Sequence, residues 1–246
     1  MDETIRDART ALACLDLTSL NDGDTAADVE RLCGRAQGPF GLPAAVCVWP
    51  RFAAHARSRL PASVGVAAVA NFPAGGSDVE AALRETQAIV DAGADEVDLV
   101  LPYRELDAAP ALVRAVRRIC EGLVLKVILE TGELQTDAAI GRACSIALDA
   151  GADFLKTSTG KTRVSATPHA ARLMLRAIAG GGHEQVGFKA AGGIRSVADA
   201  ATYITLAAEH LGDVTPRRFR IGASALLNDI EAVLGGGGAP AAGASY

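Results

Sequence analysis

Short apolar runs alternate with helix-type patterns along nearly the whole of this 246-residue chain. The segments between the runs carry apolar residues at the spacing of a buried helix face. Strands that alternate with helices predict a parallel sheet, because each helix returns the chain to the end of the sheet where the next strand begins. The predicted strands, about eight in number, are Leu12–Leu17, Ala44–Trp49, Val64–Asn71, Glu96–Val100, Leu123–Glu130, Phe154–Thr157, Val186–Ala190 and Arg218–Ile221.

About eight strand–helix units in a chain of this length favour an α/β fold of one kind, a closed (β/α)8 or TIM barrel in a single domain. The alternative is an open, doubly wound sheet, but no G-x-G-x-x-G turn follows an early strand. We expect residues 1–234 to form the barrel domain. Residues 235–246, GGGGAPAAGASY, predict a flexible tail, because few of these side chains can be buried.

Local patterns predict where several helices begin. A hydroxyl or carboxylate side chain just before a helix accepts hydrogen bonds from the free N–H groups of its first turn. The predicted starts are Ser77 with Glu80, Thr167 followed by Pro168, and Ser196 with Asp199. We expect the last helix to run from about Ser224 to Leu234.

Composition excludes several classes of protein. The net charge is −5 and basic residues form no stripe, so we expect no nucleic-acid partner. No apolar run approaches the roughly 18–20 residues of a membrane span, and the N-terminal MDETIRDART is too polar for a secretory signal. The five cysteines are far apart and form no C-x-x-C pair. This pattern predicts reduced thiols in a cytoplasmic protein, with neither disulfides nor a metal.

Charged residues interrupt the predicted strands, where a core is expected. A buried charge costs several kcal/mol unless it is paired, hydrogen-bonded or used in chemistry. One interpretation is a network of buried ion pairs that stabilises the barrel, and Lys126 and Glu130 have the parity to share one side of a strand. The interrupting residues are Asp98, Lys126, Glu130, Lys156 and Lys189.

Lys156 and Lys189 suggest a second interpretation, because they lie on consecutive predicted strands. An unprotonated lysine condenses with an aldehyde or ketone, and both burial and a neighbouring cation favour the unprotonated form. Lys156 is then the nucleophile and Lys189 holds the proton. Asp98 is placed to carry protons to and from carbon, directly or through a water. This chemistry requires no metal and no cofactor.

Glycine turns follow the last three predicted strands. In (β/α)8 barrels the loops after strands seven and eight, with a short helix N-terminus, often bind phosphate. Glycines let backbone N–H groups approach the anion, and two of the turns carry a cation. We expect a phosphorylated substrate at Gly160, Lys161, Gly192, Gly193, Arg195, Gly222 and Ser224.

Conspicuous segments occur in order along nearly the whole chain. They are CLDLTSLNDGDT, AVCVWPRF, VANFPAG, GADEVDLVLPYREL, LKVILETGEL, GADFLKTSTGK, VGFKAAGGIRS and RIGASALL. Together these segments resemble the deoxyribose-phosphate aldolase family. The resemblance implies a (β/α)8 lyase without metal or cofactor, which reversibly cleaves 2-deoxy-D-ribose 5-phosphate to D-glyceraldehyde 3-phosphate and acetaldehyde in deoxyribose catabolism.

The same resemblance implies residue roles. Lys156 would form the Schiff base, Lys189 would tune its pKa and assist proton transfer, and Asp98 would donate and accept protons. Lys126 and Asp16 would support the site, and Tyr246 at the chain end would assist proton transfer. The oligomeric state expected is a homodimer or a monomer.

One position departs from the family pattern. Related bacterial enzymes often carry G-A-S-S where this chain has Ala225 after Ser224, so one hydroxyl near the expected phosphate is missing. One neutral hydrogen bond is worth about 0.5–1.5 kcal/mol, which predicts a weaker phosphate preference. Cys47 is expected to be a small buried residue, with modification by aldehydes as the alternative. Two other functions stay open: another Schiff-base sugar-phosphate aldolase, or a catalytically silent sugar-phosphate-binding protein.

Overall fold

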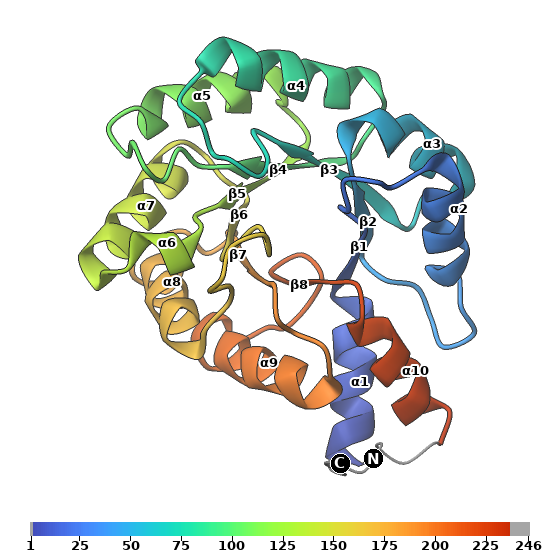
Figure 1. Ribbon diagram of the computed structural model, residues 1–246. Helices are drawn as coiled ribbons and strands as arrows, with labels where there is room; N and C mark the ends of the chain where they lie inside the picture. The colour runs from blue at the N-terminus through green and yellow to red at the C-terminus, as the bar shows by residue number, and fades with distance from the viewer. Residues whose placement is uncertain (1, 237–246) are drawn as a thin grey trace, which may run out of the picture.

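The computed structural model describes residues 2–236, and these residues form a closed barrel of eight parallel strands surrounded by helices (Figure 1). Each strand pairs with its neighbours in sequence, and β8 pairs with β1 to close the barrel. The predicted TIM barrel is confirmed, and the open doubly wound sheet is excluded. The strands are β1 (Leu15–Thr18), β2 (Ala45–Val48), β3 (Gly65–Ala70), β4 (Glu96–Val100), β5 (Val124–Ile128), β6 (Phe154–Lys156), β7 (Gly187–Ala191) and β8 (Phe219–Ala223).

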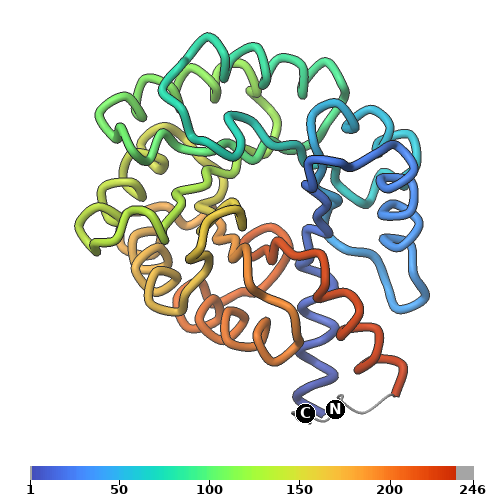
Figure 2. The backbone as a smooth tube through the Cα atoms, viewed as in Figure 1, coloured from blue at the N-terminus to red at the C-terminus, as the bar shows by residue number. Residues whose placement is uncertain are grey.

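The helices form a ring outside the strands (Figure 1). Helix α1 precedes the first strand and lies beside α10, with α9 on its other side (Figure 2). The helices are α1 (Glu3–Ala13), α2 (Ala26–Arg35), the 3-10 helix η1 (Pro50–Phe52), α3 (Ala53–Arg59), α4 (Val79–Asp91), α5 (Ala109–Ile119), α6 (Thr131–Leu134), α7 (Asp137–Asp149), α8 (Pro168–Gly180), α9 (Val197–Leu211) and α10 (Leu226–Leu234).

Several predicted boundaries shift. The first strand was predicted from Leu12, but Leu12 and Ala13 belong to α1, whose polar outer face concealed it in the sequence. The start predicted at Ser77 is wrong by one residue, since Asp78 accepts the N–H of Ala81 at 3.0 Å instead. The last helix begins at Leu226, two residues later than predicted.

Two other predicted helix starts are confirmed. The Thr167 hydroxyl accepts the N–H of Ala170 at 3.2 Å, with Pro168 in the first turn of α8. Ser196 and Asp199 form a capping box, in which each side chain accepts the backbone N–H of the other residue. The predicted tail begins where α10 ends, but residues 237–246 lie outside the described part of the chain.

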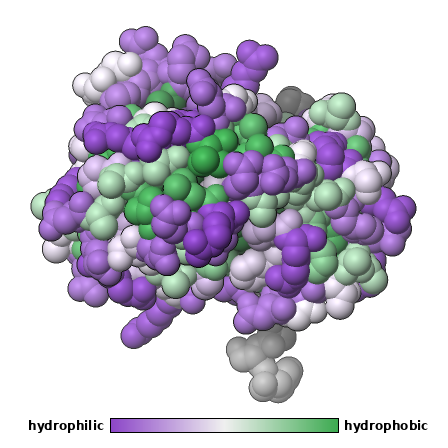
Figure 3. Space-filling model, turned by 90° about the horizontal axis from the view of Figure 1, so that it is seen from above, coloured by the Kyte–Doolittle hydropathy of each residue, from purple (hydrophilic) through white to green (hydrophobic). Residues whose placement is uncertain are grey.

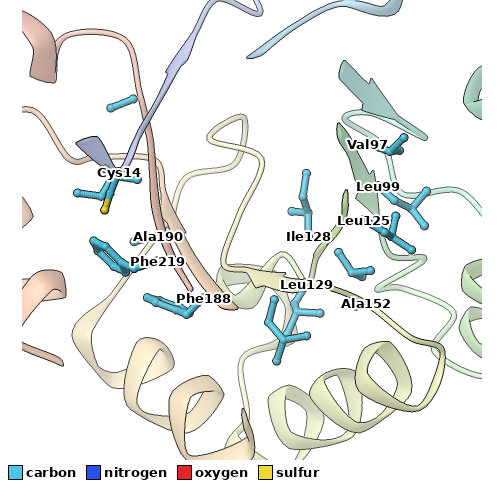
Figure 4. Close-up of a cluster of buried hydrophobic side chains, with 14 of the residues drawn as sticks. Cys14, Val97, Leu99, Leu125, Ile128, Leu129, Ala152, Phe188, Ala190 and Phe219 are labelled. Carbon is cyan, nitrogen blue, oxygen red and sulfur yellow. The ribbon is translucent and has the colours of Figure 1, made fainter. Parts of the chain in front are cut away.

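The main apolar core fills the layer between the outer face of the barrel and the helices. Figure 4 shows part of this layer, with Leu99 and Leu125 on the β4–β5 side. On the β7–β8 side the rings of Phe188 and Phe219 stack with centroids 6.4 Å apart. All five cysteines fall within the described residues, where each is a buried free thiol. The barrel interior has a different character, because strand residues of opposite parity point into it.

The molecular surface in Figure 3 mixes hydrophilic and apolar side chains, as expected for a chain that carries both signs of charge. Within residues 2–236, no helix has both the length and the apolar character needed to cross a membrane.

Tight packing inside the barrel yields a stability prediction at Gly187. A Cβ atom there would lie 2.3 Å from Cε1 of Phe154 on the adjacent strand, so Gly187→Ala forces the ring to move. Overpacking of this kind costs about 1–3 kcal/mol, and we expect the free energy of unfolding to fall by that amount in urea denaturation. Gly141→Ala is the control, because this exposed position in α7 has open space around it. It should stabilise the protein by about 0.5–1 kcal/mol, and equal effects of the two substitutions would contradict the packing argument.

Candidate active site

Charged side chains fill the centre of the barrel, contributed by β1, β4, β5, β6, β7 and β8. All of them are buried, and they form one connected set of ion pairs. The set contains Asp16, Glu96, Asp98, Lys126, Lys156, Lys189 and Arg220. The structure thus brings together five residues that the sequence marked as catalytic or supporting, while Tyr246 lies outside the described residues.

Asp98 is the centre of this set. Its Oδ2 atom accepts hydrogen bonds from Nζ of Lys156 and from Nζ of Lys189, both at 2.7 Å, and its Oδ1 accepts one from Nζ of Lys126 at 2.9 Å. The strand register explains the contacts, because Asp98 lies opposite Lys126, and Lys156 lies opposite Lys189. Burial raises the pKa of the Asp98 carboxyl, but the three lysines outweigh it and hold that pKa well below its usual value.

Lys156 and Lys189 share a carboxylate oxygen but differ in pKa. Burial lowers the pKa of Lys156, Asp98 partly offsets this, and repulsion by Lys189 keeps the pKa below its ordinary value. Lys189 also contacts Oδ2 of Asp16 at 2.5 Å, and its two carboxylate partners outweigh burial and raise its pKa. Two neighbouring lysines therefore divide into one that releases its proton readily and one that keeps it.

The balance of charges in the barrel also indicates that Lys156 is the lysine that loses its proton. Three carboxylates (Asp16, Glu96 and Asp98) face four cationic groups (Lys126, Lys156, Lys189 and Arg220) in the barrel interior. Loss of one proton leaves the cluster neutral, which is favourable in a buried environment. Lys126 has three carboxylate partners, which overcome its burial and raise its pKa well above the ordinary value. Lys156 has a single carboxylate partner within the described residues, so it is the cation that loses a proton at least cost.

Arg220 and Glu96 form the lower part of the cluster, and the sequence analysis missed both. Arg220 donates to Oδ1 of Asp16 at 2.7 Å and to Oε1 of Glu96 at 2.8 Å. Its guanidinium also lies over the ring of Phe154, 5.4 Å from the ring centroid. Both are charged residues within strands, as Asp98 is, but they lie at the first and second positions of β4 and β8, where the signal is weaker. Arg220 holds Asp16 in position to contact Lys189, and Glu96 in turn holds Arg220.

Glu130 does not join this cluster, although its parity with Lys126 suggested that it might share a side of the strand. Strand β5 ends at Ile128, and Glu130 has a φ of 56°, so the alternation of side chains along the strand does not extend to Glu130. Its carboxylate accepts hydrogen bonds from the backbone N–H and the hydroxyl of Thr159 instead.

A cavity of about 260 Å³ opens above Lys156 at the carboxyl ends of the strands. Its wall contains every residue that the sequence analysis assigned to a phosphate site. The loop after β1 and a few further residues were not foreseen as lining it. The lining residues are Thr18, Ser19, Leu20, Asn21, Lys156, Thr159, Gly160, Lys161, Ala191, Gly192, Gly193, Ile194, Arg195, Gly222, Ala223, Ser224 and Ala225.

Glycines bring the loops of this cavity close together. Gly192 has a φ of 86°, and a Cβ atom there would lie 2.5 Å from Cβ of Ser165 and 3.2 Å from Cα of Gly160. At Gly222 a Cβ atom would meet Cε of Lys189 at 3.0 Å. Gly222 therefore leaves the space through which Lys189 extends toward Asp98.

Two cationic side chains and a helix N-terminus border the cavity. Lys161 and Arg195 are exposed on its wall, and the N-terminus of α10 begins beside it at Ala225. The Ala225 side chain makes no capping hydrogen bond, which leaves N–H groups of the first turn for a ligand. A helix N-terminus with free N–H groups is a common binding site for a phosphate.

Cys47 lies inside the barrel near the lysines, packed with Leu20, Ala67 and Val69. Its side chain is fully buried, and burial raises the pKa of the thiol. It is the small buried residue that the sequence predicted. Within residues 2–236, no group of three or more His, Cys, Asp and Glu side chains is arranged to hold a metal ion.

The family model of the DeoC/LacD family aldolases matches residues 10–232. The chain belongs to this aldolase family. A Coccidioides immitis structure described as a candidate deoxyribose-phosphate aldolase is 30% identical, with a TM-score of 0.80 and coverage of 90% of this chain and 85% of that one.

More distant structures of the family have the same fold. An apo-form Toxoplasma gondii structure, also described as a candidate deoxyribose-phosphate aldolase, is 26% identical, with a TM-score of 0.85 and coverage of 95% and 97%. The deoxyribose phosphate aldolase of Aeropyrum pernix, described as a unique tetramer, is 25% identical, with a TM-score of 0.77 and coverage of 94% and 97%. The charged barrel described above is thus found in a chain of the DeoC/LacD aldolase family.

The electrostatics of this aldolase yield a prediction for Lys189→Met. Removal of that cation leaves three carboxylates facing three cations, so Lys156 should keep its proton and its pKa should rise. Reductive methylation of Lys156 across a pH series, followed by peptide mass spectrometry, should therefore require a higher pH in the variant than in the native protein. The exposed Lys161 serves as the internal reference for the reagent. A pH profile of Lys156 that does not move would contradict the assigned electrostatic role of Lys189.

Proposed function

We propose that this aldolase is a deoxyribose-phosphate aldolase, which reversibly cleaves 2-deoxy-D-ribose 5-phosphate to D-glyceraldehyde 3-phosphate and acetaldehyde. The observation that carries the proposal is the lysine pair on one carboxylate oxygen, at the floor of a cavity with a cationic, glycine-lined wall. Family membership and the structural neighbours support the same reaction.

In the first step the amine of Lys156 attacks C1 of the open-chain sugar. The resulting carbinolamine loses its hydroxyl as water and becomes an iminium ion. The amine must be unprotonated to attack, and burial together with Lys189 lowers the pKa of Lys156 in the required direction. The proton that Lys156 gives up can move to Oδ2 of Asp98, which it contacts at 2.7 Å. Asp98 passes this proton to the hydroxyl that leaves as water, and is then ionised again for the next step.

In the second step the bond between C2 and C3 breaks. The iminium ion takes up the electron pair of that bond as an enamine, and the hydroxyl on C3 becomes the aldehyde of glyceraldehyde 3-phosphate as its proton leaves. Asp98 is an ionised acceptor for this proton, directly or through a water. Asp98 holds this proton until the last step, while the ammonium group of Lys189 stays hydrogen-bonded to Oδ2 at 2.7 Å.

In the last step a proton returns to C2 of the enamine, and water hydrolyses the iminium ion to release acetaldehyde. Asp98 returns the proton that it took from the C3 hydroxyl. Lys189 assists this transfer, because its raised pKa keeps it a charged donor to Oδ2 that favours the ionised carboxylate. Lys126 contacts Asp98 directly and Asp16 contacts Lys189, so these two residues keep Asp98 and Lys189 in position. The cycle ends with Lys156 unmodified.

The phosphate of the substrate would lie at the cationic side of the cavity. Lys161 and Arg195 supply charge there, and Gly160, Gly192 and Gly193 let backbone N–H groups approach the anion. Ser224 precedes the N-cap residue of α10, and its hydroxyl and the helix N-terminus would both be available to the phosphate.

The proposal predicts a covalent adduct at one residue. Acetaldehyde with borohydride should convert Lys156 to N-ethyl lysine, detected by peptide mass spectrometry, because the reduced iminium ion cannot hydrolyse. Lys156→Ala should abolish cleavage of 2-deoxyribose 5-phosphate while the circular dichroism spectrum stays native.

Two outcomes would contradict this proposal. Absence of an adduct at Lys156, or an adduct at Lys189 alone, would exclude Lys156 as the nucleophile. A donor test separates this enzyme from an aldolase of ketose phosphates: acetaldehyde should be accepted as donor, and dihydroxyacetone phosphate should not.

Ala225 yields a second prediction for the phosphate end. The substitution Ala225→Ser adds a hydroxyl at the cavity wall beside the N-terminus of α10. One added hydrogen bond of about 0.5–1.5 kcal/mol should raise kcat/KM for 2-deoxyribose 5-phosphate roughly two- to tenfold. The kcat/KM for unphosphorylated 2-deoxyribose is the control and should stay unchanged. An equal gain on both sugars would place the effect away from the phosphate.

A further inference from the structure

Glu130 is a buried carboxylate that the reaction described above does not use. It follows β5 at the edge of the cavity, and its side chain is fully buried. Among the ion pairs of residues 2–236, none includes it. Its backbone has a φ of 56°, in the left-handed region that residues other than glycine rarely adopt. A buried acid in an uncommon conformation calls for a physical reason.

The hydrogen-bond partners of the Glu130 carboxylate among the described residues belong to the loop that follows β6. Its carboxylate accepts the backbone N–H of Thr159 at 3.3 Å and the Thr159 hydroxyl at 2.5 Å. The Thr162 hydroxyl lies 3.3 Å from the same carboxylate. The next residues of the Glu130 segment also meet this loop, since a Cβ atom on Gly132 would lie 2.1 Å from the carbonyl oxygen of Val164.

These contacts determine which N–H groups of the loop remain free. The Thr159 hydroxyl donates to Glu130 and accepts the backbone N–H of Lys161 at 3.0 Å. The N–H groups on either side of Gly160 are therefore both occupied. Among the hydrogen bonds of the described residues, none uses the N–H of Gly160, which lies on the cavity wall. Glu130 and Thr159 thus leave one backbone donor available to an anion.

The charge of Glu130 cannot help to bind a phosphate, because a carboxylate near an anion site repels the anion. Any contribution of Glu130 to phosphate binding must therefore come from the hydrogen bonds that its carboxylate accepts. Burial raises the pKa of Glu130, and the hydrogen bonds from Thr159 oppose that rise only in part.

We propose that Glu130 is a positioning residue for phosphate recognition: through Thr159 it holds the loop so that Gly160 and Lys161 face the phosphate of the substrate. The inference rests on the proposed function, since it assigns this loop to the phosphate end of the sugar. Glu130 touches neither the reacting carbon atoms nor Lys156, so its loss should affect phosphorylated ligands selectively.

The test compares Glu130→Ala with the native protein. The ratio of kcat/KM for 2-deoxyribose 5-phosphate to kcat/KM for 2-deoxyribose should fall about tenfold, as expected when two to three hydrogen bonds to one loop are lost. The Kd for inorganic phosphate, measured by titration calorimetry, should rise by a similar factor. An unchanged ratio and Kd, or an equal loss on both sugars, would overturn the inference.

Two further variants keep the test decisive if Glu130→Ala does not fold. Glu130→Gln keeps an acceptor for Thr159 without the charge, and it should retain the native ratio to within about threefold. Thr159→Val removes the hydroxyl that links Glu130 to the N–H of Lys161, and the ratio should fall as in Glu130→Ala. A native ratio in Thr159→Val would contradict the proposed link.

Glu133→Ala is the matched control. It removes the same charge three residues away, at an exposed position in α6, and should leave both sugars and the phosphate affinity unchanged. Borohydride trapping at Lys156 reports the proposed function separately, because phosphate affinity needs no carbon–carbon cleavage. If Lys156 is trapped but Glu130→Ala binds phosphate as tightly as the native protein, only the inference about Glu130 is wrong. If Lys156 of the native protein is not trapped, the proposed reaction is wrong.

Discussion

One carboxylate oxygen, Oδ2 of Asp98, holds two lysine ammonium groups at 2.7 Å each, and the chemistry of the barrel depends on this contact. Two ammonium groups so close together in a buried site do not keep their protons equally well. Lys189 has a second carboxylate partner in Asp16, and Lys156 has none within the described residues. The proton therefore stays on Lys189, and Lys156 becomes the nucleophile without any change in the fold.

The closed barrel makes this arrangement possible. The contacts of Asp98 cross from β4 to β5, β6 and β7, and Asp16 reaches Lys189 only because β1 pairs with β8. An open sheet would leave β1 and β8 at opposite edges and separate these charges. The interior also needs small residues between the charged ones, and Gly222 and Gly187 supply the space for Lys189 and Phe154. Burial of so many charges is tolerated because each has a partner of opposite sign.

Much of this structure could be predicted from the sequence. The alternation of strands and helices predicted the barrel, and charges within apolar strands marked Asp98, Lys126, Lys156 and Lys189. The same signal was present at Glu96 and Arg220, but a charge at the first or second residue of a strand resembles an ordinary strand end. Helix α1 was missed because its outer face is polar.

Glu130 shows a different limit of sequence reasoning. Parity along a strand predicted a shared side with Lys126, but parity holds only as far as the strand extends. The left-handed turn at Glu130 redirects its side chain toward Thr159, and no local pattern announces that turn. Contacts between loops of different strands, such as those at Gly160 and Gly192, also depend on the closed barrel and became visible only in the structure.

The division of roles between Lys156 and Lys189 is the central claim, and their titration tests it most directly. Nuclear magnetic resonance of protein labelled with carbon-13 at lysine Cε can follow each lysine across a pH series, with single variants assigning the signals. The account predicts that Lys156 titrates below the ordinary lysine pKa and Lys189 above it. Equal pKa values, or a lower pKa for Lys189 than for Lys156, would contradict it.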